Sequence, residues 1–210
     1  MEERIKVKNS KGKDIAAVID YPEKPYSKLA ILCPGYLDTK DYAHLKALAE
    51  RLNEKGYVVA RFDPTGTWES EGDISAYNNT QYLEDVKNVL EYMLLKGDFA
   101  DVLVGGHSRG GQISLLYAAR DQRVTRVLAI MPSSGGIRGQ RREEWEESGT
   151  SHSERDLPND ADGKKEFEVP FSHVLDRDKY DVLKDVKRIK ASIVFVAGEL
   201  DDMCLPEDVK

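Results

Sequence analysis

Residues 104–111 read VGGHSRGG, and this stretch decides how the chain is expected to fold. It contains Gly-x-Ser-x-Gly, the pattern that holds a serine on a sharp turn between a strand and a helix. An apolar run precedes the motif and a helical pattern follows it, which is the setting that such a turn requires. Gly106 and Gly110 would remove side chains where the strand and the helix crowd together. The pattern therefore predicts Ser108 as a nucleophile.

Short β-type runs alternate with amphipathic helical runs along most of the chain. We expect helices at 41–55, 81–96 and 109–120, the first capped by Asp41 and ended by Gly56. We expect strands at 4–7, 14–20, 29–33, 57–62, 102–105, 124–131 and 192–197. This alternation predicts an α/β fold with a mostly parallel central sheet and helices on both faces, within one domain spanning 1–210.

Residues 134–180 interrupt the alternation with a polar and strongly charged segment. A short helix is expected at 138–147, with Trp145 as its one large apolar anchor, and a turn at 159–163. A long segment placed directly after a strand is often functional, so we predict a cap or lid over the site. A solvated insertion is the alternative, because runs of charge usually face water.

Composition excludes several classes of function. The net charge of −7 and the pI near 5.3 argue against a nucleic-acid partner, which needs a basic face. No apolar run approaches the roughly 20 residues that span a bilayer, and the first residues lack the apolar core of a secretion signal. We therefore expect no membrane contact, a cytoplasmic location, and reduced thiols at Cys33 and Cys204. No metal or cofactor is expected.

Three further segments fit the same site as the serine motif. CPGYLD (33–38) follows a buried strand, FDPTGTWESEG (62–72) follows the next strand, and VAGELDD (196–202) places acids at the end of a late strand. Together with GHSRGG, and in this order, they resemble the serine α/β-hydrolases. The nearest branch is the small esterases and acyl-peptidase-like members that carry a short cap. The resemblance extends from about Lys28 to Lys210.

The resemblance implies that Ser108 is the nucleophile and that Asp201, three residues after Gly198, is the acid of a catalytic triad. Asp202 is the weaker candidate for the acid. In the family that it resembles, the triad residues follow one another along the chain as serine, acid and histidine. With typical element lengths, the histidine is expected about 25 to 35 residues after the acid. Only residues 202–210 follow Asp201. We therefore expect the catalytic histidine beyond residue 210, a sheet that lacks its last strand and helix, and weak or absent activity of the 1–210 chain alone.

Two backbone N–H groups are expected to form the oxyanion hole. One belongs to Arg109, the residue after the serine, and the other to Tyr36, in the loop after the buried strand. The histidine that usually precedes the glycine of this loop in the family is Pro34 here. This change leaves the backbone donor intact but removes a side chain that braces the loop.

The four histidines of the chain are weaker candidates for the base. We expect His107 to pack locally beside the serine, His44 to lie at the surface or rim, and His152 to be exposed in the insertion. His173 is the best of them, although a packing role is favoured over a catalytic one. With Trp145, His173 is a candidate for the lining of a pocket.

The expected reaction is hydrolysis of a small-molecule carboxylic ester through an acyl-serine intermediate. Two alternatives stay open: a peptidase of the acyl-peptidase type, and a non-catalytic protein of the same fold that binds a ligand or a partner. A sheet edge left uncovered in the 1–210 chain would also favour dimerisation or aggregation.

Overall fold

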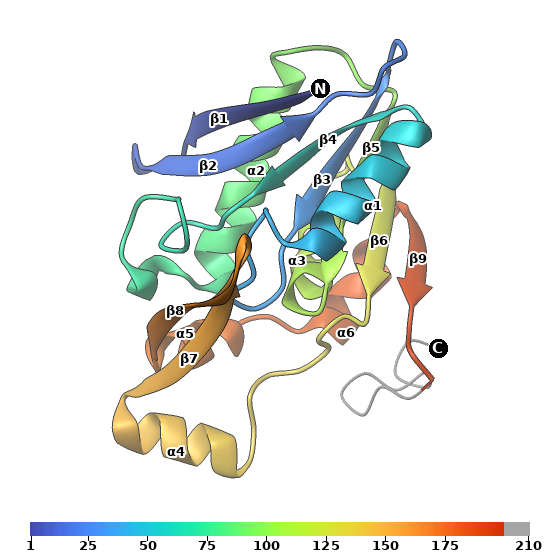
Figure 1. Ribbon diagram of the computed structural model, residues 1–210. Helices are drawn as coiled ribbons and strands as arrows, with labels where there is room; N and C mark the ends of the chain where they lie inside the picture. The colour runs from blue at the N-terminus through green and yellow to red at the C-terminus, as the bar shows by residue number, and fades with distance from the viewer. Residues whose placement is uncertain (200–210) are drawn as a thin grey trace.

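The computed structural model describes residues 1–199, and its centre is a seven-stranded sheet (Figure 1). The strand order is β1-β2-β4-β3-β5-β6-β9, in which β1, β2 and β4 pair antiparallel and β4, β3, β5, β6 and β9 pair parallel. The sheet is therefore mostly parallel, as predicted. Its strands are β1 (Glu2–Lys8), β2 (Asp14–Asp20), β3 (Lys28–Cys33), β4 (Tyr57–Phe62), β5 (Asp101–His107), β6 (Arg126–Ile130) and β9 (Ser192–Val196).

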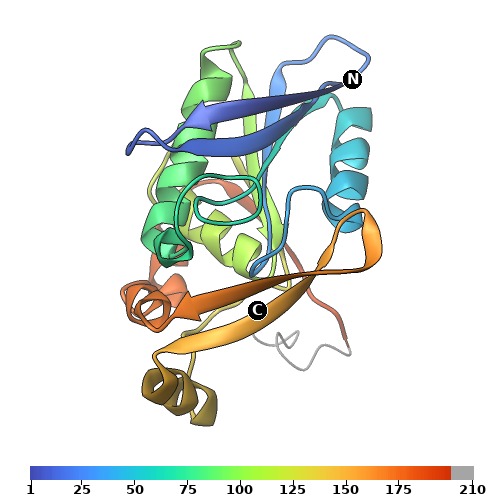
Figure 2. The ribbon, with the colours of Figure 1, turned by 60° about the vertical axis from the view of Figure 1, so that its left-hand side comes forward.

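Helices cover both faces of this sheet, which confirms the predicted layers (Figure 2). Helix α1 (Ala43–Glu54) packs on one face, whereas α2 (Asn79–Leu94) and α3 (Arg109–Ala118) pack on the other. The central strands are buried on both sides: Ala30 and Leu32 of β3 join the α1 cluster, and Leu29 and Ile31 join the larger one. This is why β3 reads as an unbroken apolar run in the sequence.

The helices begin and end within two residues of the predicted positions, and one predicted helix cap differs. Helix α1 begins at Ala43, with Tyr42 at its N-cap, and no side chain caps it. The prediction that Asp41 caps this helix is wrong, because the Asp41 carboxylate instead accepts two hydrogen bonds from Arg4 at 2.9 and 3.1 Å. Gly56 follows the end of the helix with a φ of +81°, a conformation that suits glycine.

Between β6 and β9 the chain builds the insertion, which is more ordered than its composition indicates. Its elements are α4 (Gln140–Ser148), the hairpin of β7 (Thr150–Leu157) and β8 (Asp160–Pro170), and α5 (Ser172–Arg177). Helix α6 (Val182–Asp185) and the short helix η2 (Val186–Arg188) follow the insertion and lead to β9. The hairpin lies near the carboxyl ends of the parallel strands (Figures 1 and 2). Trp145, Phe167 and Val169 are buried in the main core, so the insertion packs firmly on the fold and is not a solvated loop.

One more short helix, η1 (Ile74–Ala76), lies in the connection between β4 and α2. Within residues 1–199 no helix is both long and apolar enough to cross a membrane. Cys33 is a buried free thiol, and burial raises its pKa to about 12. Cys204 lies outside the described residues.

Candidate active site

Ser108 occupies the turn between β5 and α3 with a φ of +52° and a ψ of −117°, a strained conformation for a residue with a side chain. Its backbone N–H donates to the carbonyl of Ile130 at 2.9 Å. Its own carbonyl accepts from the N–H groups of Gln112 at 3.1 Å and Ser133 at 3.2 Å. These bonds fix the backbone, while the Ser108 hydroxyl makes no hydrogen bond to any of residues 1–199.

The two glycines of the motif allow β3 to approach this turn. A Cβ atom at Gly106 would lie 2.2 Å from the carbonyl oxygen of Cys33, and one at Gly110 would lie 1.9 Å from the same atom. Both distances are far below van der Waals contact, so only glycine fits at either position. The close packing places the turn at Ser108 directly beside the loop that follows Cys33.

Backbone strain marks the same end of the sheet. Within residues 1–199, four residues other than glycine have a positive φ: Leu37, Trp68, Ser108 and Met131. Leu37 lies in the loop after β3 and accepts a hydrogen bond from the Trp68 indole at 2.9 Å, and Met131 directly follows β6. Strained residues cluster at functional sites because the surrounding structure must hold them in place. The clustering therefore supports the assignment of the site independently of the serine motif.

Side chains brace the loop of residues 34–38, which we call the oxyanion loop after the role predicted for the N–H group of Tyr36. Its carbonyls from residue 34 to residue 37 each accept a side-chain hydrogen bond. The donors, in order, are Tyr82 at 2.8 Å, Tyr77 at 3.4 Å, Arg155 at 3.1 and 3.2 Å, and Trp68 at 2.9 Å. The Tyr77 hydroxyl also accepts from the N–H of Leu37 at 2.9 Å. These contacts supply the bracing that the proline at position 34 cannot.

The backbone N–H groups of Tyr36 and Arg109 are the two predicted oxyanion donors. Neither donates a hydrogen bond to any acceptor within residues 1–199. Arg109 is also the first residue of α3, where the helix dipole favours negative charge. Its guanidinium lies 5.9 Å from the centre of the Tyr36 ring, which places the two residues side by side.

His173 packs against Arg109 and Tyr36 and is 1% exposed. Its Nδ1 lies 2.8 Å from the carbonyl of Tyr77, its Nε2 lies 3.1 Å from the Arg109 guanidinium, and its ring stacks on Trp145. Burial, reinforced by the charge of Arg109, lowers the pKa of His173 to about 2. The imidazole is therefore neutral and engaged, with no hydrogen bond to Ser108, as expected of a packing histidine.

None of the other three histidines makes a hydrogen bond to the Ser108 hydroxyl. His44 and His107 line a cavity of about 340 Å³ together with Asp38, and burial lowers the pKa of His44. His152 is exposed on the hairpin, 3.7 Å from Glu154. The predicted acid, Asp201, and its neighbour Asp202 lie outside the described residues.

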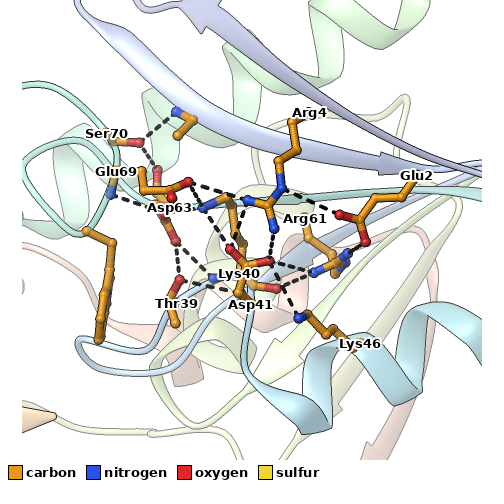
Figure 3. Close-up of polar contacts among 12 residues, drawn as sticks. Glu2, Arg4, Thr39, Lys40, Asp41, Lys46, Arg61, Asp63, Glu69 and Ser70 are labelled. Atoms are coloured by element: carbon orange, nitrogen blue, oxygen red, sulfur yellow. Dashed lines mark hydrogen bonds and ion pairs between the residues drawn. The ribbon is translucent and has the colours of Figure 1, made fainter. Parts of the chain in front are cut away.

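A buried ionic network, which the sequence analysis did not identify, holds the far end of the oxyanion loop (Figure 3). The Lys40 ammonium lies 2.7 Å from Asp63, 2.6 Å from Glu69 and 3.2 Å from Asp41. Lys40 is 1% exposed and Asp63 is fully buried. Burial lowers the pKa of Lys40, but the three carboxylates outweigh this effect and the net pKa is raised. The network joins the segment after the oxyanion loop to the loop of residues 63–72.

Comparison with known proteins agrees with this geometry. Residues 25–145 match the sequence profile of the hydrolase family described as serine aminopeptidase, S33. The chain belongs to this family. Among curated proteins, the mitochondrial palmitoyl-protein thioesterase ABHD10 of Mus musculus is 23% identical over 177 residues, which is 82% of this chain and 58% of that protein. The chain thus spans little more than half the length of this relative.

Solved structures share the α/β-hydrolase fold with this chain. Est1E from Butyrivibrio proteoclasticus, solved with ferulic acid, is 20% identical with a TM-score of 0.78, covering 98% of this chain and 82% of that one. The α/β-hydrolase GrgF from Penicillium sp. sh18 is 19% identical with a TM-score of 0.81, covering all of this chain and 84% of that one. At these identities the similarity shows the fold, and the predicted fold family is confirmed.

Proposed function

We propose that this chain carries the nucleophile and the oxyanion hole of a serine hydrolase that cleaves carboxylic esters, thioesters included. One observation carries the proposal: within residues 1–199 the Ser108 hydroxyl makes no hydrogen bond at its strained turn, and the N–H groups of Tyr36 and Arg109 have no acceptor. The Ser108 oxygen would attack the substrate carbonyl carbon and pass its proton to a base. The N–H groups of Tyr36 and Arg109 would stabilise the oxyanion that forms.

The rest of the reaction follows the two-step scheme of acyl transfer. Collapse of the tetrahedral intermediate expels the alcohol or thiol, which takes the proton from the base, and leaves the acyl group on Ser108. Water then attacks the acyl-serine and loses a proton to the same base. The bond between the acyl carbon and the Ser108 oxygen breaks, Ser108 takes the proton back from the base, and the carboxylic acid is released. We place this base outside residues 1–199, with Asp201 as the acid that orients it, because no histidine within the described residues bonds to Ser108.

We further propose that the insertion forms one wall of the acyl pocket. Arg155 of β7 holds the Tyr36 carbonyl, and Lys165 of β8 donates to the Trp68 carbonyl at 3.0 Å, so the hairpin is tied to the oxyanion loop and to its neighbour. The names of the relatives support an acyl substrate, since one is a thioesterase and another was solved with an aromatic acid. Trp145 and His173 are buried and stack on each other, so they would support this wall from within the core.

The test compares three substrates on the protein in its natural full length and on the Ser108→Ala variant of the same length. p-Nitrophenyl acetate reports esters, S-acetyl N-acetylcysteamine reports thioesters, and alanine p-nitroanilide reports the peptidase alternative that the family description raises. We expect turnover of the first two substrates, loss of it in the variant, and none for the anilide. Turnover of the anilide alone would establish a peptidase, and ester turnover unchanged in Ser108→Ala would refute the proposal.

A further inference from the structure

Three side chains with metal-binding chemistry converge beside the β5–α3 turn at Ser108, which we call the elbow, on the side where α1 packs. Asp38 ends the oxyanion loop, His44 is the second residue of α1, and His107 is the last residue of β5. One ligand atom from each lies within 4.8 Å of the other two. The Asp38 carboxylate is 3.8 Å from His44 Nε2, and the two imidazole rings lie 6.0 Å apart in an edge-to-face arrangement.

These three polar side chains lie close together but do not hydrogen-bond to one another. No hydrogen bond joins any two of these side chains within residues 1–199, and the Asp38 carboxylate has a backbone hydrogen bond with Gly35. Gly35 makes the approach feasible, because a Cβ there would lie 2.4 Å from the Asp38 carboxylate and 3.5 Å from His107 Nδ1. A side chain at position 35 would therefore push the carboxylate away from the imidazoles.

We propose that Asp38, His44 and His107 bind a divalent transition-metal ion, of which Zn²⁺ is the best match. Two imidazoles and one carboxylate suit zinc in ligand type and number, and three protein ligands leave a fourth position for water. The cavity of about 340 Å³ that these residues line provides space for that fourth ligand. Tetrahedral zinc would hold its ligand atoms roughly 3.4 Å apart, so the three groups must close by about 1 Å. His44, half of whose side chain is exposed, is free to make this movement.

The position of the site gives the ion a structural consequence. Asp38 is two residues after Tyr36, and His107 directly precedes Ser108. A bound ion would therefore cross-link the oxyanion loop to the elbow, the two segments that close packing at Gly106 and Gly110 already brings together. This inference does not depend on the proposed hydrolase activity.

A second group of similar residues serves as an internal control. His152, Glu154 and Glu166 lie on the outer face of the β7–β8 hairpin, and all three are exposed. None of them lines the cavity beside the turn at Ser108. Removal of His152 therefore matches removal of His44 in chemistry but leaves the proposed site intact.

Isothermal titration of the metal-free protein, in its natural full length, with Zn²⁺ tests the proposal. We expect one site whose affinity falls by at least about 100-fold in His44→Ala and is unchanged in His152→Ala, since removing a ligand costs more than removing its outer partner. Asp38→Asn should weaken binding as well. Zinc should also raise the midpoint of thermal unfolding in the parent chain and in His152→Ala, but not in His44→Ala. Absence of binding, or binding that survives His44→Ala and is lost in His152→Ala, would overturn the assignment.

Discussion

Replacement of Lys40 by methionine tests how much the buried ionic network stabilises the fold. Methionine keeps the length and most of the volume of the side chain but removes the charge. The fully buried carboxylate of Asp63 would then lose its cation, which lies 2.7 Å away in the native chain. It would keep hydrogen bonds from the Thr39 hydroxyl and from the backbone N–H of residue 40, both at 2.9 Å.

The magnitude follows from the charge that is left behind. Removing one partner of a buried ion pair costs about 3 to 5 kcal/mol, because the other partner remains uncompensated. In a chain of this length each kcal/mol shifts the unfolding midpoint by roughly 2 to 4 °C, so Lys40→Met should lower it by roughly 6 to 20 °C. The double variant Lys40→Met/Asp63→Asn removes the stranded charge and should regain most of the loss.

Urea unfolding and thermal melts of the two variants and the parent chain provide the measurement. The matched control is Lys164→Met, which breaks an ion pair with Asp156 that is exposed to solvent, and we expect no resolvable change there. A loss of less than about 1 kcal/mol in Lys40→Met would refute the reasoning, because it would mean that water compensates Asp63. Failure of the double variant to recover would show that the loss arises from packing.

Three further predictions concern stability and assembly. Burial raises the pKa of Asp85 to about 6, above its value in the unfolded chain, so its stabilising contribution is present at low pH and is lost as the pH rises through 6. In urea unfolding, Asp85→Asn should therefore gain up to about 3 kcal/mol of unfolding free energy relative to the parent chain between pH 4 and pH 8. A gain that does not vary with pH would contradict this. Gly110→Ala should cost about 2 kcal/mol or more in the same assay, because its Cβ would meet the Cys33 carbonyl, whereas Gly135→Ala, with open space around it, should be tolerated. Val194 is 57% exposed on β9, the edge strand of the described sheet. We therefore expect dimers that form with increasing concentration in sedimentation experiments, and we expect Val194→Lys to remove them. A monomer at all concentrations would refute this.

The fold could be predicted from the sequence because its signals are local and periodic. The buried strands read as apolar runs, and the Gly-x-Ser-x-Gly pattern fixed the position of the turn at Ser108. Strand β7 of the insertion gave no such signal. The side of β7 that faces the protein carries Ser151, Ser153 and Arg155, which are all polar, so its alternation with exposed residues is invisible to hydrophobicity.

The site was predictable only where one residue type is required by backbone geometry. Gly106 and Gly110 belong to this class, because close approach excludes every side chain. Lys40 does not, since nothing in the run Asp-Thr-Lys-Asp distinguishes a buried lysine from an exposed one. Its burial depends on carboxylates that are distant in sequence, and Asp41 was misassigned as a helix cap for the same reason: its partner, Arg4, lies on a strand far away in the chain.

Covalent labelling tests the central claim, that Ser108 is a nucleophile beside an oxyanion hole, most directly. The protein in its natural full length is treated with a fluorophosphonate probe, and the modified residue is located by mass spectrometry. We predict that Ser108 is the labelled serine and that Ser108→Ala abolishes labelling. The variant Ser133→Ala, which removes a neighbouring hydroxyl, should leave it intact. Labelling that persists in Ser108→Ala, or that maps to another residue, would contradict the account.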